Sequence, residues 1–434
     1  MPRLTAITAF CALTGSVWAS PLTLEPLVIV GESYGDMPGV ISQTSGESQI
    51  NNSGQWVTRV AGTDAGGSFL GTYIFTHDGI RHDPFTVVPF NETLTFRTSP
   101  PNAFYSSINN HGQIATTFNG LVSDADGNLV GSRSMIAVDG SPVLRTGDTT
   151  PFGGTYGGFG STRHILNDQG HLLANFDLFF NPFSTFETVI EFSPSESGYD
   201  QTVRMTPGMP LQDGYSVRSD NPANWGSFDF SNNGNMVFGV GVANSDLIAR
   251  PAIVVNGIIR RMSGATDAFP DGEFSLFRGQ VAINDSADFA YQGFMLSSDW
   301  EGGRRAIMRN EDEIVWIDDG SDPSLADYTD IGAGAISITE GGDVIWQALI
   351  QDSLGASWTA LFHNDLVIAT SDPNFLGDAL FIEDGFSFDV SDNGQWIIFD
   401  TPHGIYRTLI PSPGAAAILA LTTLSTTRRR RKPA

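Results

Sequence analysis

A short polar sequence recurs seven times along the chain, and this repetition constrains the fold more than any other feature. Each copy has an apolar residue, then small polar residues, and in six copies Gly at the fifth position. The copies, which we call the repeat turns, are residues 50–54, 108–112, 166–170, 230–234, 283–287, 338–342 and 390–394. Successive copies are 58, 58, 64, 53, 55 and 52 residues apart. Such a period is typical of propeller blades or comparable arrays.

Each repeat turn predicts a strand, a tight turn and a second strand. Asn and Asp hydrogen-bond the backbone of a turn and tolerate a left-handed conformation, and Gly supplies a positive φ. Ala287 replaces the Gly in one copy, so we expect that turn to be strained or differently shaped. The residues assigned to the turns, in a structural role, are Asn51, Gly54, Asn109, Gly112, Asn167, Gly170, Asn232, Gly234, Asn284, Asp285, Gly342, Asp392 and Gly394.

Further strands follow each repeat turn. About 20 residues on, an apolar run meets a hairpin signal such as Asp139-Gly140 or Asn256-Gly257, and another short strand follows. Residues 27–32 resemble a fourth strand without its first three, and residues 404–409 a third strand without its fourth. Together they would complete one blade. The prediction is an all-β, seven-bladed β-propeller from residue 21 to 409, whose closing blade is shared between the two ends.

The first 20 residues are typical of a secretory signal peptide. Arg3 gives the positive start, residues 4–18 are mostly apolar, and Ala19 and Ser20 stand at the expected cleavage point. The alternative is an apolar first strand. Cys11 is the only cysteine and lies in this segment, so the body cannot contain a disulfide.

The last 25 residues, 410–434, are typical of a second targeting signal. A Pro-x-Pro-Gly sequence precedes an apolar run and a basic cluster; the residues assigned to this signal are Pro411, Pro413, Gly414, Arg428, Arg429, Arg430 and Arg431. The order resembles the PEP-CTERM class of bacterial sorting signals, although Ser412 stands in place of the usual Glu. The resemblance implies processing by exosortase-type machinery after temporary insertion in the membrane. A permanent C-terminal anchor is the alternative.

The repeats also resemble the tandem-repeat surface proteins found with exosortase-type anchors in environmental bacteria. Asn51, Asn109, Asn167 and Asn284 take the Asn position of the Asn-x-x-Gly turn, and a Phe follows at a variable offset. The resemblance implies a secreted protein of the bacterial cell envelope. It implies no reaction.

The charge of the body limits its partners. The formal net charge is −26, and six of the 22 basic residues lie in the two end segments, which leaves 16 basic against 48 acidic residues, or −32. Such a body repels nucleic acid phosphates and anionic lipid. We expect a monomer that binds no nucleic acid, with Ca²⁺ as a weak possibility and otherwise no cofactor.

No catalytic, cofactor or metal residue can be assigned from the sequence. The seven histidines lack metal-ligand spacing and most lie in predicted turns, which favours exposed polar positions. Residues 124–128 resemble the start of a calcium loop, but Met135 occupies the twelfth position, so a hairpin turn is favoured.

Two functional hypotheses remain. The first is a surface or matrix protein that binds polysaccharide through long loops at residues 93–105, 181–213 and 318–329. Aromatic candidates for stacking on sugars are Tyr105, Phe152, Tyr156, Phe159 and Trp225. The second is a propeller-type glycan lyase or hydrolase at the channel mouth. Three or more His, Asp, Glu or Arg side chains that converge in one channel pocket would favour the enzyme.

Overall fold

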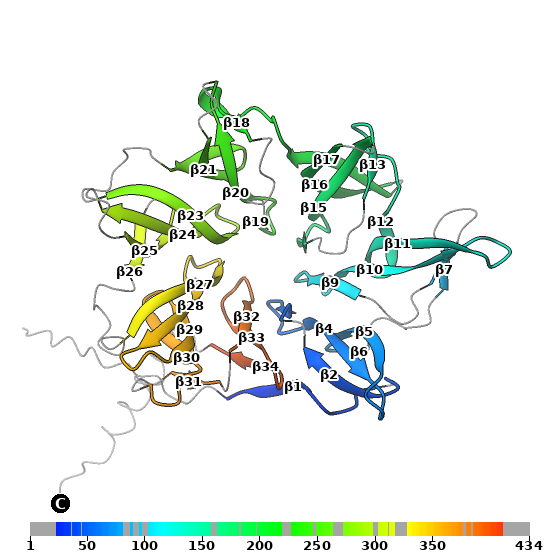
Figure 1. Cartoon of the computed structure of the whole chain (residues 1–434), viewed down its shortest axis with the longest axis horizontal. Helices are drawn as coiled ribbons and strands as arrows, with labels where there is room; N and C mark the ends of the chain where they lie inside the picture. The colour runs from blue at the N-terminus through cyan, green and yellow to red at the C-terminus, as the bar shows by residue number, and fades with distance from the viewer. Residues whose placement is uncertain are drawn as a thin grey trace, which may run out of the picture.

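Seven antiparallel sheets surround a central axis in the computed structural model, so the chain is a seven-bladed β-propeller (Figure 1). We number the blades 1 to 7 by the repeat turn that each contains. The structure describes residues 23–35, 37–44, 46–80, 87–89, 95–97, 103–157, 163–181, 184–196, 198–218, 227–245, 249–263, 272–297, 303–310, 312–316, 328–375, 379–382 and 385–410.

The first four blades have an innermost strand that is divided into two pieces, each paired with the second strand. Blade 1 comprises β2 (Val40–Thr44), β3 (Gln49–Ile50), β4 (Trp56–Thr63), β5 (Phe69–Thr76) and β6 (Gly79–Ile80). Blade 2 comprises β7 (Val87–Pro89), β8 (Thr95–Arg97), β9 (Ala103–Ile108), β10 (Ile114–Ser123), β11 (Leu129–Val138) and β12 (Ser141–Arg145). Blade 3 comprises β13 (Thr155–Tyr156), β14 (His164–Leu166), β15 (Leu172–Asn181), β16 (Ser184–Ser195) and β17 (Gly198–Met205). Blade 4 comprises β18 (Ser216–Val217), β19 (Ser227–Phe230), β20 (Met236–Ala243), β21 (Ala249–Val255) and β22 (Ile258–Met262), preceded by the 3-10 turn η1 (Gln212–Gly214).

The last three blades have one continuous innermost strand. Blade 5 comprises β23 (Gly272–Ile283), β24 (Phe289–Ser297), β25 (Gly303–Arg309) and β26 (Asp312–Trp316). Blade 6 comprises β27 (Tyr328–Ile338), β28 (Val344–Asp352), β29 (Ser357–His363), β30 (Leu366–Thr370) and β31 (Leu380–Phe381). Blade 7 comprises β32 (Ser387–Val390), β33 (Trp396–Thr401), β34 (Gly404–Leu409) and the N-terminal strand β1 (Glu25–Ile29).

Blade 7 closes the ring as predicted, because its outermost strand comes from the other end of the chain. β1 pairs antiparallel with β34, from Glu25 opposite Arg407 to Ile29 opposite Gly404. Val28 is fully buried in this pairing. The Arg407 guanidinium binds the Glu25 carboxylate at 2.8 and 3.0 Å and also donates to the carbonyl of Gly54 in blade 1. The two ends of the chain therefore hold each other and the first repeat turn.

The alternation of strand direction gives the disc two different faces. The repeat turns and the hairpins between third and fourth strands lie on one face, which we call the turn face. The hairpins between second and third strands and the connections between blades lie on the opposite face, the loop face. All seven repeat turns are therefore on the same face.

The hydrophobic core lies between neighbouring blades. One cluster joins Ala115 and Ile136 of blade 2 to Phe176 and Phe192 of blade 3. Inside it the Phe176 and Phe192 rings meet edge to face with centroids 5.7 Å apart. Burial of such side chains stabilises a fold by about 1.5–3 kcal/mol each. The stability of each blade therefore depends on both neighbours.

One predicted loop was wrong. Residues 181–213 were expected to form a long connection, but most of them form β16 and β17, the third and fourth strands of blade 3. The outer strand carries exposed polar residues such as Asp200 and Thr202, which hide the apolar pattern of a strand. The proposed stretch at 93–105 contains β8, part of an extra hairpin, and the start of β9. Most of the stretch at 318–329 lies outside the described residues.

The predicted signal peptide at residues 1–20 lies outside the described residues, as does the predicted sorting segment at 410–434 except for its first residue, the last one described. Within the described part of the chain, no helix is long and apolar enough to cross a membrane.

Candidate functional site

The repeat turns form a hydrogen-bonded ring around the central channel. The Asn51 side-chain oxygen accepts from the backbone amides of Ser53 and Gln55 at 3.0 and 2.9 Å, which holds its own turn. Its amide nitrogen donates to the carbonyl of Asn109 in the next blade at 2.9 Å. Asn109 repeats the arrangement toward Asn167, and Asn284 repeats it toward Thr339, each at 2.9 Å. One side chain therefore serves both the turn and the junction between blades.

Other bonds join the blades where the Asn is absent or its bond is long. Asn167 is 3.5 Å from the carbonyl of Asn232, and the junction is reinforced by the Asn232 side chain, which accepts from the Asp168 amide at 3.1 Å. The three blades with Ser or Thr use different residues. The amides of Asn233, Glu340 and Asn393 donate to Asp285, Asp392 and Asn52 at 2.8, 2.6 and 2.8 Å, respectively. All seven junctions are bridged at this level.

Asp392 extends the network across the channel. Its carboxylate, from blade 7, accepts from the side-chain amides of Asn110 in blade 2 and Asn232 in blade 4, at 2.9 and 2.7 Å. Burial raises the pKa of Asp392, and the carboxylates of Asp168 and Asp285 raise it further. Three blades that are not neighbours are therefore tied together at the turn face.

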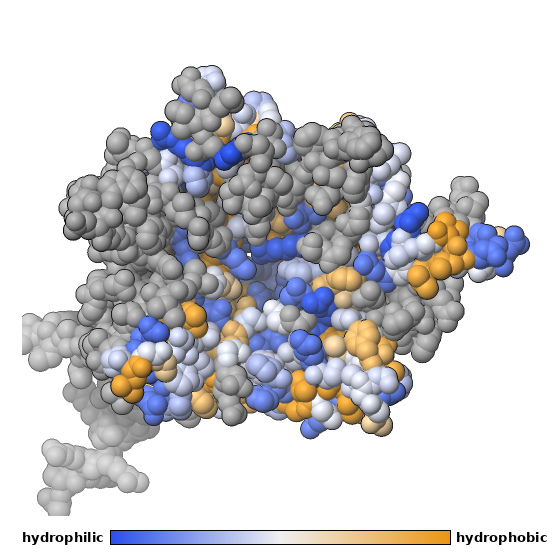
Figure 2. All heavy atoms as spheres, in the orientation of Figure 1, coloured by the Kyte–Doolittle hydropathy of each residue, from blue (hydrophilic) through white to orange (hydrophobic). Residues whose placement is uncertain are grey.

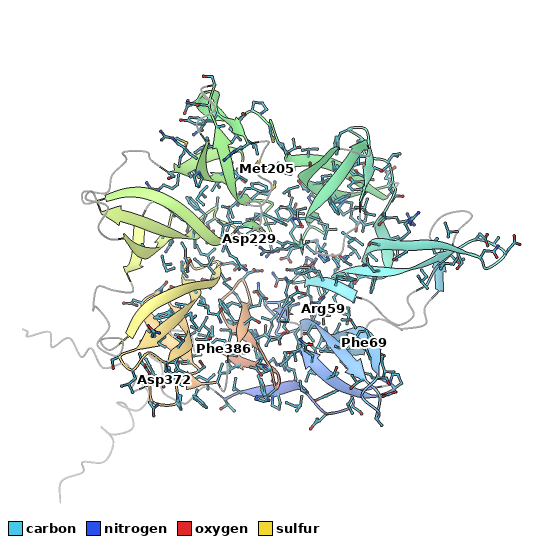
Figure 3. The ribbon with its side chains drawn as sticks, in the orientation of Figure 1. Arg59, Phe69, Met205, Asp229, Asp372 and Phe386 are labelled. Atoms are coloured by element: carbon cyan, nitrogen blue, oxygen red, sulfur yellow. The ribbon has the colours of Figure 1, made fainter. Side chains whose placement is uncertain are left out.

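A polar cavity of about 130 Å³ lies in the channel beside this bridge. Asp229, Asp389 and Arg163 line it, and Figure 3 shows Asp229 at the inner end of its blade. Asp389 accepts from the amide of Ile50 at 3.0 Å, and Asp229 accepts from the amide of Ile283 at 2.9 Å. Burial raises the pKa of Asp389 to about 7 and also raises that of Asp229, against which the positive charge of Arg163 acts.

More than three Asp, Glu or Arg side chains converge in this cavity, which meets the criterion stated above for an enzyme. Their hydrogen bonds and the small volume of the cavity nevertheless favour a structural role. Asp229, Asp389 and Asp392 each accept hydrogen bonds from other blades. Ligand pockets for small molecules occupy about 300–1,000 Å³. A cavity of about 130 Å³ is smaller than such pockets and does not enclose a segment of polysaccharide. Among the described residues, no His, Cys, Asp and Glu group has the arrangement of a metal site.

Sequence reasoning missed Asp229 and Asp389, although a signal exists. Both precede an apolar residue and then Ser231 or Ser391, so Asp-x-Ser occurs where other copies have Asn. Serine cannot donate as Asn does to the next blade. The Asp accepts an amide from the next blade at these two junctions, and Gln49 accepts the equivalent amide of Ile108 at 3.2 Å in the blade that has Asn51.

The histidines and acidic turns have mixed outcomes. Residues 124–128 form the hairpin that was favoured over a calcium loop, with the Asp124 carboxylate accepting from the amides of Asp126 and Asn128 at 3.0 and 2.8 Å. Of the four histidines predicted to be exposed in turns, His111 is exposed, whereas His77, His171 and His363 are partly buried. No such prediction was made for His164. It is fully buried, 3.0 Å from the Ser107 hydroxyl, and burial lowers its pKa to about 3.

The predicted sugar-stacking aromatics do not gather in one place. Tyr156 is buried against Phe176 in the core between blades 2 and 3. Tyr105 packs edge to face on His164, with centroids 4.9 Å apart. Phe152 is 40% exposed on the loop face. Phe159 and Trp225 lie outside the described residues.

Comparisons with known proteins identify similar solved structures at low identity. No family model matches the chain, and no curated protein matches it. A protein of unknown function from Dyadobacter fermentans aligns over 90% of this chain and 98% of its own, with 9% identity and a TM-score of 0.33. A polysaccharide lyase, an ulvan lyase, aligns over 91% and 99%, with 12% identity and a TM-score of 0.36. A glucose dehydrogenase aligns over 75% and 95%, with 11% identity and a TM-score of 0.30. At these values no substrate or activity carries over.

Proposed function

We propose that this propeller is a secreted, envelope-associated binding or structural protein whose loop face binds extracellular polysaccharide. The observation that carries the proposal is the uneven distribution of exposed apolar side chains. Among the described residues, eight large hydrophobic residues are exposed toward the loop face, namely Phe69, Leu121, Leu129, Val130, Phe152, Leu349, Leu354 and Phe381. Three are exposed toward the turn face, namely Ile258, Leu366 and Leu409.

The kinds of residue on the two faces sharpen the contrast. Exposed apolar groups cost free energy in water, and their uneven distribution supports placing the proposed interaction surface on the loop face. The three exposed aromatic rings of the described residues, Phe69, Phe152 and Phe381, are on the loop face, with exposures of 58, 40 and 49%. Flat apolar rings can pack against the C–H faces of sugars, and Figure 3 shows Phe69 near the periphery of the disc. The turn face instead presents the Asn and Asp side chains of the ring.

Glycan-array binding of the protein, with and without calcium, tests this proposal. Replacing Phe69, Phe152 and Phe381 together by Ser should reduce the array signal at least tenfold. The matched control replaces Ile258, Leu366 and Leu409 by Ser on the turn face and should leave the signal within twofold. Equal losses in both triple variants, or no binding of the parent protein to any glycan, would exclude the loop face as a polysaccharide site.

The proposed location rests on the two targeting signals read from the sequence. Cleavage after Ala19 would release the propeller outside the cytoplasm, and the segment at 410–434 would hold it in the membrane until exosortase-type processing. Mass spectrometry of the mature protein tests both. A mature chain that starts at Ser20 and lacks the Arg428–Arg431 cluster is expected, whereas retention of the cluster indicates a permanent anchor.

The second candidate is a glycan lyase or hydrolase at the channel mouth. Its support is the convergence of Arg163, Asp229 and Asp389, one of which has its pKa raised to about 7 by burial. A carboxyl group with such a pKa can act as a general acid at neutral pH. Product analysis on bound glycans distinguishes the candidates. Shortened products that disappear in Asp389→Asn would favour the enzyme.

A further inference from the structure

The β10–β11 hairpin of blade 2 extends beyond its blade and leaves part of one edge unpaired. Both strands have ten residues, and Figure 1 shows the hairpin projecting from the disc. On one side, β8 pairs with the outer part of β10, opposite Leu121 to Ser123. On the other side, β12 pairs only with residues 135–138 of β11. Residues 129–133 pair with β10 on their inner side and, within the described part of the chain, have no strand on their outer side.

The backbone of this edge points outward at Ser132. The carbonyl of Ser134 accepts a hydrogen bond from the amide of Thr146, and the amide of Ser134 donates to the Thr146 hydroxyl, both at 2.9 Å. The backbone groups of Ser134 therefore face away from β10. Because direction alternates along a strand, Ser132 faces the same way. Its carbonyl accepts from the guanidinium of its neighbour Arg133 at 2.9 Å. Its amide has no bonding partner among the described residues.

The side chains along this edge protect it incompletely. Leu129 and Val130 are 63% and 48% exposed, and Figure 2 shows a hydrophobic patch on the projecting hairpin. Exposed edge strands normally carry charges or are covered, because they otherwise pair with other chains. The outer strand of blade 3 follows that rule, with exposed Asp200 and Thr202. The edge at 129–133 follows it only in part, because its one charged residue is Arg133 and the exposed Leu129 and Val130 stand beside it.

The negative charge around this edge favours a partner with basic residues. Asp124 and exposed Asp126 form the tip of the hairpin, and the body as a whole is strongly acidic. A second copy of the chain would bring two acidic bodies together. We propose that residues 129–133 bind an extended peptide segment by strand addition, and that the segment alternates apolar and basic residues. Backbone bonds would supply affinity, Leu129 and Val130 the apolar contact, and the tip carboxylates the charge preference.

Binding of a defined peptide to the full chain tests the proposal. The probe is a fluorescent seven-residue peptide that alternates Val and Lys, and its Val/Glu counterpart and an N-methylated Val/Lys form serve as comparisons. Fluorescence anisotropy should show at least tenfold tighter binding of the Val/Lys peptide than of either comparison. Ser132→Pro, which removes the outward amide, should weaken binding at least tenfold, while Ser132→Ala, which keeps it, should not.

Val130→Lys provides a variant that does not threaten the fold, because the side chain is half exposed, and it should also weaken binding. Binding that survives both Ser132→Pro and Val130→Lys would overturn the proposal, as would absence of binding by the Val/Lys peptide. Analytical ultracentrifugation of the parent protein tests whether a second copy of the chain binds at this edge instead. A dimer that becomes a monomer in Ser132→Pro would assign this edge to a second copy and overturn the peptide partner.

Discussion

The two ends of the second strand carry the same turn built from different residues. At the channel, Asn51 accepts the amides two and four residues on, and its carbonyl accepts the amide of Gly54 at 2.9 Å. At the outer end of the same strand, Asp64 accepts the amides of Gly66 and Ser68, both at 2.8 Å, and its carbonyl accepts the amide of Gly67 at 2.9 Å. Asp124 and Asp352 repeat the outer form.

The two turns differ because the side chain of the inner turn also makes a hydrogen bond to the next blade. An Asp carboxylate suffices where the turn has only to be held, since it accepts hydrogen bonds and the outer tips are in water. At the channel the side chain must also donate to the next blade, which only the amide of Asn can do. In this turn geometry, Asn therefore occurs where the turn bonds to the next blade, and Asp occurs where the turn is exposed to water.

Opening the ring is the most severe test of the inner turns, because a ring of junctions requires a closed array. Deleting residues 27–30 removes fully buried Val28 and the pairing of β1 with β34. With about 1.5–3 kcal/mol per buried side chain, we expect the Tm to fall by about 10 °C or more in differential scanning calorimetry. Glu25→Ala, which removes only an exposed ion pair, should cost about 1 kcal/mol or less. A tolerated deletion would contradict the shared closing blade.

A matched exchange within blade 2 separates the two turns directly. Asn109→Asp keeps the acceptor bonds but removes the donor to the buried carbonyl of Asn167 and adds charge beside an acidic channel. We expect a loss of about 2–4 kcal/mol in the free energy of unfolding, measured by urea denaturation. Asp124→Asn makes the opposite change at an exposed tip and should leave the unfolding midpoint unchanged. Similar effects of the two exchanges would mean that the inner amide has no special role.

The pH dependence of stability should also distinguish the two ends. The folded state holds the proton of Asp389 up to pH about 7, against a usual pKa of 3.8, so this contribution is full below pH 3.8 and is lost as the pH rises through about 7. Hydrogen bonds from its own turn lower the pKa of Asp64, so that contribution is present above pH 3.8 and is lost on further acidification. The Tm should decline from pH 5.5 to 8, and less so in Asp389→Asn. An identical decline in that variant would exclude Asp389 as the source.

The repeated elements of the fold could be predicted from the sequence, whereas the contacts between distant blades could not. Turn spacing and hairpin signals led to seven blades and a shared closing blade, because local backbone rules are the same in every copy. The cross-channel bridge of Asp392 to Asn110 and Asn232 joins residues 282 and 160 positions apart, and no local pattern encodes such a distance. The polar outer strand of blade 3 was missed because edge strands carry few apolar residues.

The smallest expected effect concerns the one inner turn without glycine. Ala287 keeps the shape of the other turns, with its amide 3.0 Å from the carbonyl of Asn284, but it does so at φ 62°. A side chain in this left-handed region costs about 1–2 kcal/mol, part of which glycine loses again through the entropy of the unfolded chain. Ala287→Gly should therefore add about 0.5–1 kcal/mol and raise the Tm by a few degrees or less in differential scanning fluorimetry. Gly234→Ala is the inverse control, since an added methyl there meets nothing within 4 Å and changes only the backbone cost at φ 84°. If Ala287→Gly lowers the Tm while Gly234→Ala lowers it too, the inner turns are limited by something other than backbone strain.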